Sequence, residues 1–492
     1  MLALAIRHTN KLIRRTVAAE GIRLGRFFTT AAEAKELAAG LPLPVKEEVR
    51  LLDVGAGTGI LTAAAVEALC RDGHVRRILL DAYECDGRLL PTLADILERV
   101  RRRAKHDYDV RLVVRIHGED FMESARGLAE PSGDGERYDI ALLSPPTGMP
   151  AEDSPAARFC QRVLPRFTDL AFLFAEATAA RLGEGGVMAA ILPLSFADSV
   201  GAAPLRERLF ARAPLFLLTL DAGRRGNRPD KTMLAYFRYG EEPGALRVRV
   251  KRTEGFEELP PIPYPVAVFS SECKVLLAKS KEDVALVRAM NSFPYRLSDF
   301  GLTVKTGLTI ESRYRDCLRS DRRDGAVPLL QPAGLVGGQV RFPTPGKPTP
   351  YLVPRIPSLR EPNRTMVLVK RAPTKKDGRH LVTGVYLSGQ LPYDAAISTD
   401  NKLNVIKAVE GEMEAALAIG LSALLSSHYY ERYCSLTGAL SHVNAAALLS
   451  LPLPERAILL SIGQRLSAAR NYSLRAADAV SRAALSACFL LE

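Results

Sequence analysis

The chain has 492 residues, which is enough for two or three domains, each with its own hydrophobic core. Hydrophobic residues make up 47% and charged residues 25%, and no apolar run reaches the roughly 18 residues of a membrane-spanning helix, so we expect a globular protein without a membrane partner. The seven cysteines are scattered without a C-x-x-C pair, which excludes a disulfide framework or zinc knuckle. This use of cysteine is typical of the reducing cytoplasm, and we expect no bound metal. The net charge of +12 favours a polyanionic partner.

Apolar residues at helical spacing predict a first helix within residues 1–21, and a transit peptide is the alternative for this basic segment, which has no acid before Glu20. From residue 49 to about residue 240, apolar strands then alternate with helices. This alternation implies right-handed crossovers, so we expect an α/β fold built on a doubly wound, mostly parallel, Rossmann-like sheet. The expected strands cover 49–55, 76–86, 109–121, 138–144 and 187–193, and the expected helices cover 60–73, 89–105 and 169–186.

The alternation of strands and helices breaks after about residue 250, where proline-rich sequence indicates an interdomain linker. Segments rich in Pro, Gly and β-forming residues continue to about residue 410, and Ala- and Leu-rich helical sequence follows. We therefore expect a first domain at 1–250, a linker at 251–268, and a mixed α+β domain with C-terminal helices at 269–492.

A glycine-rich turn follows the first predicted strand and opens a helix. In "LLDVGAGTGILT", Asp53 stands just before Gly55, Gly57 and Gly59. A carboxylate there would repel the pyrophosphate of a dinucleotide, whose fingerprint is G-x-G-x-x-G, but it suits a ligand with an ammonium group, such as S-adenosyl-L-methionine. A nicotinamide-dependent dehydrogenase is the alternative enzyme class on fold alone, and a purely structural nucleic-acid module would leave the glycines without a role.

Acidic residues end the second and third predicted strands. Glu84 comes about 25 positions after the glycine turn, a spacing that suits a carboxylate bonding both ribose hydroxyls. Asp120, in "HGEDF", is placed to accept a hydrogen bond from an adenine amine. Each acid alone is interpreted as a helix cap or a solvated strand end. Together with the glycine turn they fall at one edge of the sheet, where open α/β sheets bind ligands, so we predict a cofactor site there.

The fourth predicted strand ends in a stiff loop, Ser144-Pro145-Pro146-Thr147. Proline fixes its own φ and donates no hydrogen bond, so the chain is rigid where this strand stops. The loop follows a strand, as the glycine turn and the two acids do, which places it at the edge of the sheet that carries the predicted cofactor site.

In this order the motifs resemble those of the gamma class of amino-methyltransferases, and in particular the PstI-type adenine-specific DNA modification methylases of Type II restriction-modification systems. The segment "GRFFTTAAEAKELA" at 25–38, with Phe28 and Thr29, is similar to the family's G-Q-[FY]-F-T-P segment. The resemblance places this segment over the methionine end of the cofactor. The family's catalytic N-P-P-[YF] loop matches Ser144-Pro145-Pro146-Thr147.

The resemblance covers the chain nearly end to end, with loosely kept motifs. In the second half, "VKTGLTIESRYRDCL", "MVLVKRAPTKKDGRHLV", "STDNKLNVI" and "LTGALSHVNAAAL" resemble signature segments of the family. The matched positions are Thr306, Gly307, Arg313, Lys370, Arg371, Thr374, Lys375, Arg379, Asn401, Asn404, Gly438, Val443 and Asn444. We expect DNA contacts from Arg313, Lys370, Arg371, Lys375, Lys376 and Arg379. The alternative for the basic cluster at 370–379 is a solvated hairpin.

The resemblance implies a site-specific DNA methyltransferase that moves a methyl group from S-adenosyl-L-methionine to the 6-amino group of an adenine flipped out of double-stranded DNA. In the family, an Asn oxygen and the first Pro carbonyl accept hydrogen bonds from the amine, and an aromatic residue after the prolines stacks on the base. Here Ser144 keeps an acceptor oxygen, whereas Thr147 cannot stack. Tyr236 or Phe237 is the candidate for a second aromatic wall.

These departures from the family pattern leave other functions open. They are methylation of the 4-amino group of cytosine, DNA binding with weak or no catalysis, and methylation of RNA or a small molecule. The sequence has no recognisable nuclease-like second active site, so a cognate restriction endonuclease would be a separate chain. We expect a monomer in the cytoplasm.

Overall fold

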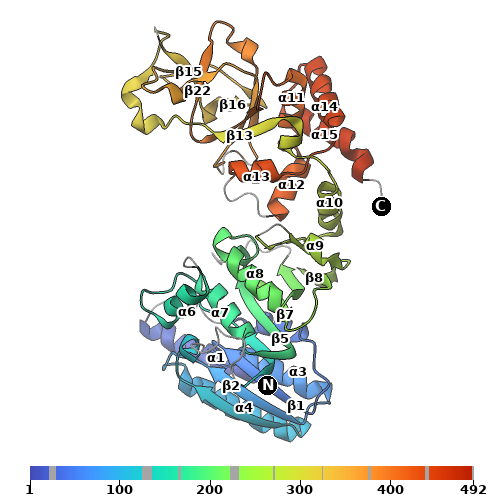
Figure 1. Ribbon diagram of the computed structural model, residues 1–492. Helices are drawn as coiled ribbons and strands as arrows, with labels where there is room; N and C mark the ends of the chain where they lie inside the picture. The colour runs from blue at the N-terminus through green and yellow to red at the C-terminus, as the bar shows by residue number, and fades with distance from the viewer. Residues whose placement is uncertain are drawn as a thin grey trace. The chain divides into compact units, whose positions relative to one another are not determined.

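The computed structural model describes residues 1–20, 29–124, 136–164, 168–221, 232–269, 272–323, 325–374, 377, 379, 381–437 and 443–489. The chain divides into two compact units, Met1–Ser280 and Lys281–Glu492 (Figure 1). Within the described residues, no helix is long and apolar enough to cross a membrane. The same residues contain no group of three or more His, Cys, Asp and Glu side chains that could hold a metal ion.

The first unit is built on one ten-stranded sheet in the order β3-β2-β1-β4-β5-β7-β6-β8-β10, with β9 paired to β8. Neighbours from β3 to β5 are parallel, whereas β7 is antiparallel to both β5 and β6. The predicted doubly wound, mostly parallel sheet is therefore confirmed. The strands are β1 (Glu48–Val54), β2 (Arg77–Tyr83), β3 (Arg111–His117), β4 (Tyr138–Leu143), β5 (Leu182–Pro193), β6 (Leu215–Asp221), β7 (Thr232–Arg238), β8 (Ala245–Arg252), β9 (Gly255–Glu258) and β10 (Ile262–Pro263).

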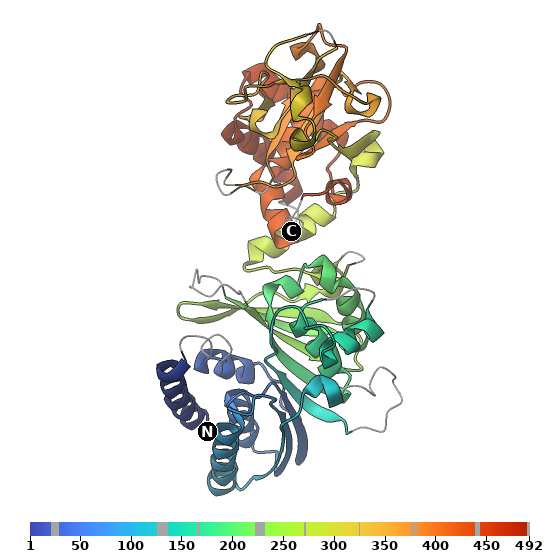
Figure 2. The same ribbon diagram turned by 90° about the vertical axis from the view of Figure 1, so that its left-hand side faces the viewer.

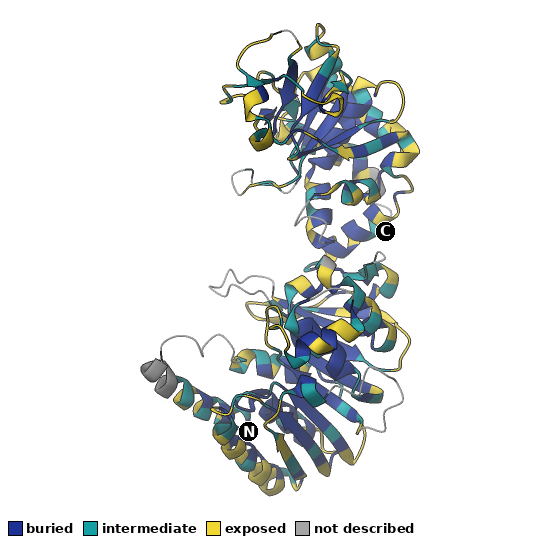
Figure 3. Ribbon diagram, turned by 60° about the vertical axis from the view of Figure 1, so that its left-hand side comes forward, coloured by how far each residue is buried: buried dark blue, intermediate teal, exposed yellow. Residues whose placement is uncertain are grey.

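Helices cover both faces of this sheet. Figure 2 shows α1, α3 and α4, in blue, on one side of the strands, and α6, α7 and α8, in teal to green, on the other. The central strands are buried on both faces, as parallel strands between helix layers must be (Figure 3). The helices are α1 (Leu2–Glu20), α2 (Ala31–Ala39), α3 (Ile60–Asp72), α4 (Leu90–Tyr108), α5 (Phe121–Ser124), α6 (Pro155–Val163), α7 (Leu170–Ala179), α8 (Ala203–Arg212) and α9 (Tyr264–Ala267).

The spacing of apolar residues explains how the helices dock. In α4 the buried side chains recur every three or four residues, which gives the helix one apolar stripe toward the sheet. Its arginines lie on the opposite face, where Arg99 pairs with Asp95, and Arg101 and Arg102 pair with Glu98. The buried stripe consists of Leu93, Ile96, Leu97, Val100 and Ala104.

Two predicted segments differ in the structure. The helix expected at 169–186 ends at Ala179, because Leu182 already pairs with Tyr138 as the start of β5. Residues 251–268, predicted as a linker, instead extend the sheet through β9 and β10, which both pair with β8. The boundary between the units lies later, at 280/281, after the small hairpin of β11 (Val268–Phe269) and β12 (Lys274–Val275).

The second unit is a mixed α+β structure with two sheets and a cap of helices. One sheet has the order β13 (Leu302–Thr306), β23 (Leu403–Ala408), β20 (Met366–Lys370), β21 (Thr383–Tyr386), β17 (Gln339–Val340) and β16 (Leu335–Val336). The other has the order β14 (Leu318–Arg319), β18 (Tyr351–Leu352), β15 (Val327–Leu330), β22 (Ala396–Thr399) and β19 (Glu361–Pro362). The helices are α10 (Lys281–Asn291), α11 (Ala415–Leu425), α12 (His428–Leu436), α13 (Ala445–Ser450), α14 (Arg456–Ala469) and α15 (Leu474–Phe489).

Candidate functional site

The candidate site lies where the strand order of the first unit reverses, between β1 and β4. In open α/β sheets this switch point, outside the carboxyl ends of the strands, is the usual place for a ligand. The loops after β1 and β4 contact each other here. The Ser144 N–H donates to the Val54 carbonyl at 3.4 Å, and a Cβ on Gly55 would stand 3.0 Å from the Ser144 carbonyl oxygen. The glycine turn and the proline loop therefore form one surface.

The glycine turn is held in a conformation that other residues rarely adopt. Gly55, Gly57 and Gly59 have φ values of 71°, 57° and 84°. The N–H groups of Gly55 and Ala56 both donate to the Tyr83 carbonyl, at 3.1 and 2.9 Å, so the turn is fixed to the end of β2. Apart from its chain neighbours, no described residue has an atom within 4 Å of the place where a Cβ on Gly57 would stand. The backbone is thus open to close approach by a ligand.

The N-terminal helix α1 contacts the glycine turn through a side-chain hydrogen bond. The hydroxyl groups of Thr9, on α1, and Thr58, inside the turn, share a buried hydrogen bond of 2.7 Å. Nothing in the local sequence around either threonine signals this pair, which joins residues 49 positions apart. The predicted first helix is confirmed, and the structure adds that it braces the glycine turn.

Glu84 links the turn to the loop after β2. Its carboxylate accepts the Gly57 N–H at 2.8 Å through one oxygen and the Asp86 N–H at 2.8 Å through the other. The side chain is half-buried, so both oxygens keep lone pairs that can accept further hydrogen bonds. The carboxylate that the sequence predicts for the ribose hydroxyls is therefore fixed beside the glycine turn.

Asp120 lies at the same edge, after β3. One of its oxygens caps α5 by accepting the Met122 N–H at 2.8 Å. Partial burial raises the pKa of the Cys85 thiol, and the carboxylates of Glu84 and Asp120 raise that pKa further. Glu84 and Asp120 therefore both lie near Cys85, at the same edge of the sheet.

Asp53 differs from the other two acids because it is fully buried. The Thr62 hydroxyl donates to one carboxylate oxygen, while the other oxygen has no hydrogen-bond partner among the described residues. Burial raises the pKa of Asp53 to about 7, and the hydrogen bonds from Thr62 offset only part of this effect. An unpaired carboxylate oxygen under an open glycine turn fits a ligand that carries an ammonium group.

The proline loop receives one further contact, from the segment that precedes α2. Thr29 and Ser144 share a hydrogen bond of 3.0 Å between their hydroxyl oxygens. Thr29, predicted to bind cofactor, therefore lies directly on the predicted catalytic loop. Thr147 is exposed, and Phe28 lies outside the described residues.

The expected second aromatic wall is wrong. Tyr236 and Phe237 are both 0% exposed in β7, so neither can face a base. The Tyr236 hydroxyl donates to the Leu37 carbonyl at 3.0 Å and fastens α2 to the sheet. Both aromatic rings belong to the core, because β7 lies inside the sheet between β5 and β6.

Several predicted DNA-binding residues of the second unit make contacts within their own unit. Lys370 pairs with Asp377 at 2.6 Å, Arg371 donates to the Asn401 carbonyl at 2.9 Å, and Arg379 donates to the Ser426 carbonyl. Arg313 is exposed and has no side-chain partner among the described residues. Lys375 and Lys376 lie outside the described residues. Of the predicted cations that the structure describes, Arg313 is therefore the exposed one.

The signature segments of the second unit meet in space. The Thr306 hydroxyl donates to the Asn404 side chain at 3.2 Å, and the Asn404 amide donates to the Val443 carbonyl at 2.6 Å. Asn404 is fully buried, and Asn444 caps α13 through the Ala447 N–H. These matched positions thus hold the second unit together, while Gly438 lies outside the described residues.

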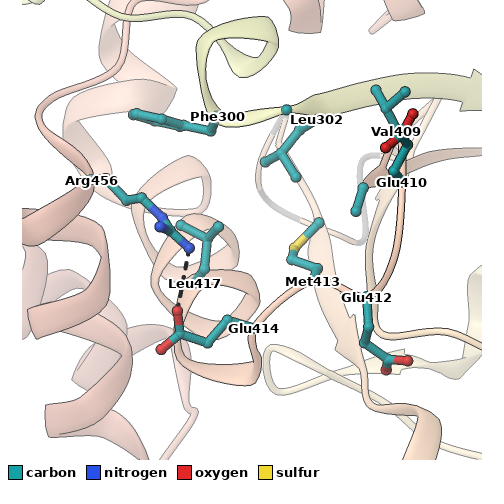
Figure 4. A pocket seen from close by; sticks show the side chains of 11 residues that line it. Phe300, Leu302, Val409, Glu410, Glu412, Met413, Glu414, Leu417 and Arg456 are labelled. Atoms are coloured by element: carbon teal, nitrogen blue, oxygen red, sulfur yellow. Dashed lines mark hydrogen bonds and ion pairs between the residues drawn. The ribbon is translucent and has the colours of Figure 1, made fainter.

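The second unit also contains an open cavity of about 330 Å³ (Figure 4). Apolar side chains of Phe300, Leu302 and Met413 face a rim where Glu414 pairs with Arg456 at 3.3 Å. None of the predicted site residues lines this cavity.

The strand order β3-β2-β1-β4-β5-β7-β6, with β7 antiparallel, defines the class I methyltransferase fold. The cofactor of this class is S-adenosylmethionine, and the glycine turn and the acids after β2 and β3 lie at the ligand edge of the sheet.

Comparisons with known proteins agree with this class. No family model matches the sequence. The chain is 24% identical over 456 residues to Type II methyltransferase M.BsuBI of Bacillus subtilis, across 90% of this chain and 89% of the relative. It is 25% identical over 448 residues to Type II methyltransferase M.PstI of Providencia stuartii, across 88% and 87%. The resemblance to the PstI-type methylases is confirmed, and with it the class of enzyme, a methyltransferase.

Among solved structures, the Type IIL restriction-modification enzyme MmeI in complex with DNA covers 99% of this chain and 73% of its own, with a TM-score of 0.48 and 10% identity.

Proposed function

We propose that this chain methylates the 6-amino group of adenine in double-stranded DNA, with S-adenosylmethionine as methyl donor. One observation carries the proposal: Ser144, at the start of the proline loop, is hydrogen-bonded to Thr29 and touches the glycine turn at the switch point of the sheet. A hydroxyl acceptor on a rigid loop therefore stands beside the predicted donor site. The net charge of +12 suits a polyanionic substrate.

The cofactor would lie across the carboxyl ends of β1, β2 and β3. Gly57 leaves its backbone open, Glu84 would bond the ribose hydroxyls, and Asp120 would accept from the adenine amine. Asp53 would face the ammonium group. When bound, S-adenosylmethionine supplies an electrophilic methyl group on its sulfonium sulfur.

The proline loop would prepare the target amine. An exocyclic amine is a weak nucleophile because its lone pair is delocalised into the ring. Acceptors on its N–H groups draw the nitrogen toward tetrahedral geometry and localise that lone pair. Ser144 can donate its proton to Thr29, which leaves its own lone pairs to face the amine, and the Pro145 carbonyl would be the second acceptor. Because both acceptors are fixed before the reaction, positioning supplies much of the rate.

This arrangement predicts a role for Thr29 that differs from cofactor binding. Thr29→Val should lower kcat about tenfold, the size of one neutral hydrogen bond, because the Ser144 hydroxyl loses the partner that orients it. Thr29→Ser keeps the hydroxyl and should stay near the wild type. Affinity for S-adenosylmethionine, measured by calorimetry, should change little in either variant. A selective loss of cofactor affinity in Thr29→Val would instead assign Thr29 to the cofactor.

Arg313 is exposed, and it is one of the positions that the family resemblance matches, so it should contact DNA. Arg313→Gln should weaken binding and reduce the slope of log K against log salt by about one, since one phosphate contact releases about one counterion. Arg482→Gln is the matched control, because Arg482 pairs with Asp478 on its own helix. If Arg313 reads a base instead, the salt slope stays constant and the sequence preference relaxes.

The proposal is tested by incubating unmethylated plasmid DNA with the protein and labelled S-adenosylmethionine, followed by digestion to nucleosides. We expect methyladenine. Methylcytosine would move the target to the 4-amino group, and DNA binding without any methylated product would reduce the chain to a binding protein. The same reaction with Ser144→Ala should be at least about tenfold slower.

A further inference from the structure

The segment after the proline loop carries an exposed apolar side chain, Met149, which is 64% exposed. The other large apolar side chains of the first unit that are exposed, among the described residues, are Val45, Ile116 and Phe256. Val45 precedes β1, Ile116 lies within β3, and Phe256 lies in β9. Met149 alone belongs to a loop that leaves the carboxyl end of β1 or β4.

The backbone that carries Met149 is fixed at the preceding residue. The Gly148 N–H donates to the Asp169 carboxylate at 2.9 Å, and the Gly148 carbonyl accepts the Leu170 N–H at 2.7 Å. Asp169 also caps α7 by accepting the Ala171 N–H at 2.9 Å. With both polar groups of Gly148 held at the start of α7, and a φ of 107° that favours glycine, Met149 projects from a defined position.

A base that leaves the duplex loses its stacked neighbours, and enzymes receive it between aromatic or apolar side chains. Thr147 offers only one methyl group, and Tyr236 and Phe237 are buried in the core. The thioether of methionine is polarizable and flexible, and it packs well against the edge or face of an aromatic ring. Met149 has this chemistry and is accessible within the loop that would hold the amine.

We propose that Met149 supplies the apolar surface on which the flipped target base rests. This inference rests on the proposed function for its substrate and extends it by naming the residue that holds the base. In this arrangement Ser144 and Pro145 contact the amine, while Met149 contacts the ring.

The test compares Met149→Gln, which keeps the length but not the apolar character, with Met149→Leu. DNA affinity is measured in the presence of S-adenosylhomocysteine for two duplexes that contain the site identified on methylated plasmid DNA. One duplex carries the target base, and the other has an abasic position in its place. Met149→Gln should weaken binding of the first duplex by about two- to tenfold, the range of sulfur–aromatic contacts, and leave the abasic duplex unaffected. Met149→Leu should resemble the wild type.

Val45→Ala is the matched control, since Val45 is an exposed apolar residue at the opposite edge of the sheet. Equal weakening of both duplexes by Met149→Gln would indicate a merely structural role, and unchanged binding of the base-containing duplex would show that Met149 does not touch the base. Either result overturns the inference. Absence of methyl transfer by the wild type would instead overturn the proposed function, and that assay precedes the comparison of variants.

Discussion

Glu84→Ala should lower the affinity for S-adenosylmethionine by roughly 100-fold or more. In the proposed site, the variant would remove two charge-assisted hydrogen bonds to the ribose, each of which would contribute about 1.5–3 kcal/mol. It also releases the Gly57 N–H, which the carboxylate holds at 2.8 Å, so the glycine turn loses one of its attachments. Titration calorimetry of the full chain measures the change directly.

Glu84→Gln is the informative companion of this variant. Its amide oxygen can still accept the Gly57 N–H, but its NH₂ group cannot accept from a ribose hydroxyl or from the Asp86 N–H. We therefore expect an intermediate loss of affinity, with circular dichroism like that of the wild type. Unchanged affinity for S-adenosylmethionine in Glu84→Ala, with the fold intact, would show that Glu84 does not bind the cofactor.

Asp53→Asn should make the ligand-free protein more resistant to heat while it weakens cofactor binding. Burial raises the pKa of Asp53 from 3.8 to about 7, so between these pH values the folded chain holds a proton that the unfolded chain has lost. The contribution of Asp53 to stability therefore falls as pH rises from about 4 to about 7, and the total cost above that window reaches roughly 4 kcal/mol. Asparagine stays neutral and still accepts from Thr62, so the gain in Tm over the wild type should grow between pH 5 and pH 8.

Cofactor binding should show the opposite dependence on pH. An ammonium group near Asp53 favours the carboxylate, so binding to the wild type below pH 7 should release a proton, and affinity should rise with pH by up to about tenfold per unit. Calorimetry in buffers of different ionisation enthalpy measures how many protons are released for each cofactor molecule bound. In Asp53→Asn the proton release should vanish. A Tm difference that is the same at pH 5 and pH 8 would place the ionisation elsewhere.

The order of motifs along the chain was sufficient to predict the site edge. Asp53 lies near the end of an apolar strand, and Glu84, Asp120 and Ser144 each follow one. Parallel strands present their carboxyl ends at one edge, so no knowledge of side-chain packing was needed. Local signals also predicted the helices, because buried residues in α4 recur at helical spacing. A boundary is predicted wrongly where one residue type carries two signals: the glycines that indicate the end of a helix at 169–186 lie in the first residues of β5.

Contacts between distant residues could not be predicted in this way. Thr9 and Thr58 are 49 positions apart and Thr29 and Ser144 are 115 apart, and a single threonine or serine carries no pattern that names its partner. The cations of the second unit show the same limit. The sequence indicates no partner for Lys370, whereas in the structure its ammonium group lies 2.6 Å from a carboxylate oxygen of Asp377.

The sequence by itself determined the parallel sheet, the place of its ligand edge and the identity of the acids along it. Strand periodicity and chain order are local properties, so the sequence alone is sufficient to recognise them. Only the tertiary structure decided how each group is used. It buried Asp53 and the Tyr236 ring, set Thr29 against Ser144, and left Met149 exposed beside the proline loop. Burial and hydrogen-bond partners depend on which distant segments pack together, and these govern the pKa and accessibility on which the chemistry depends.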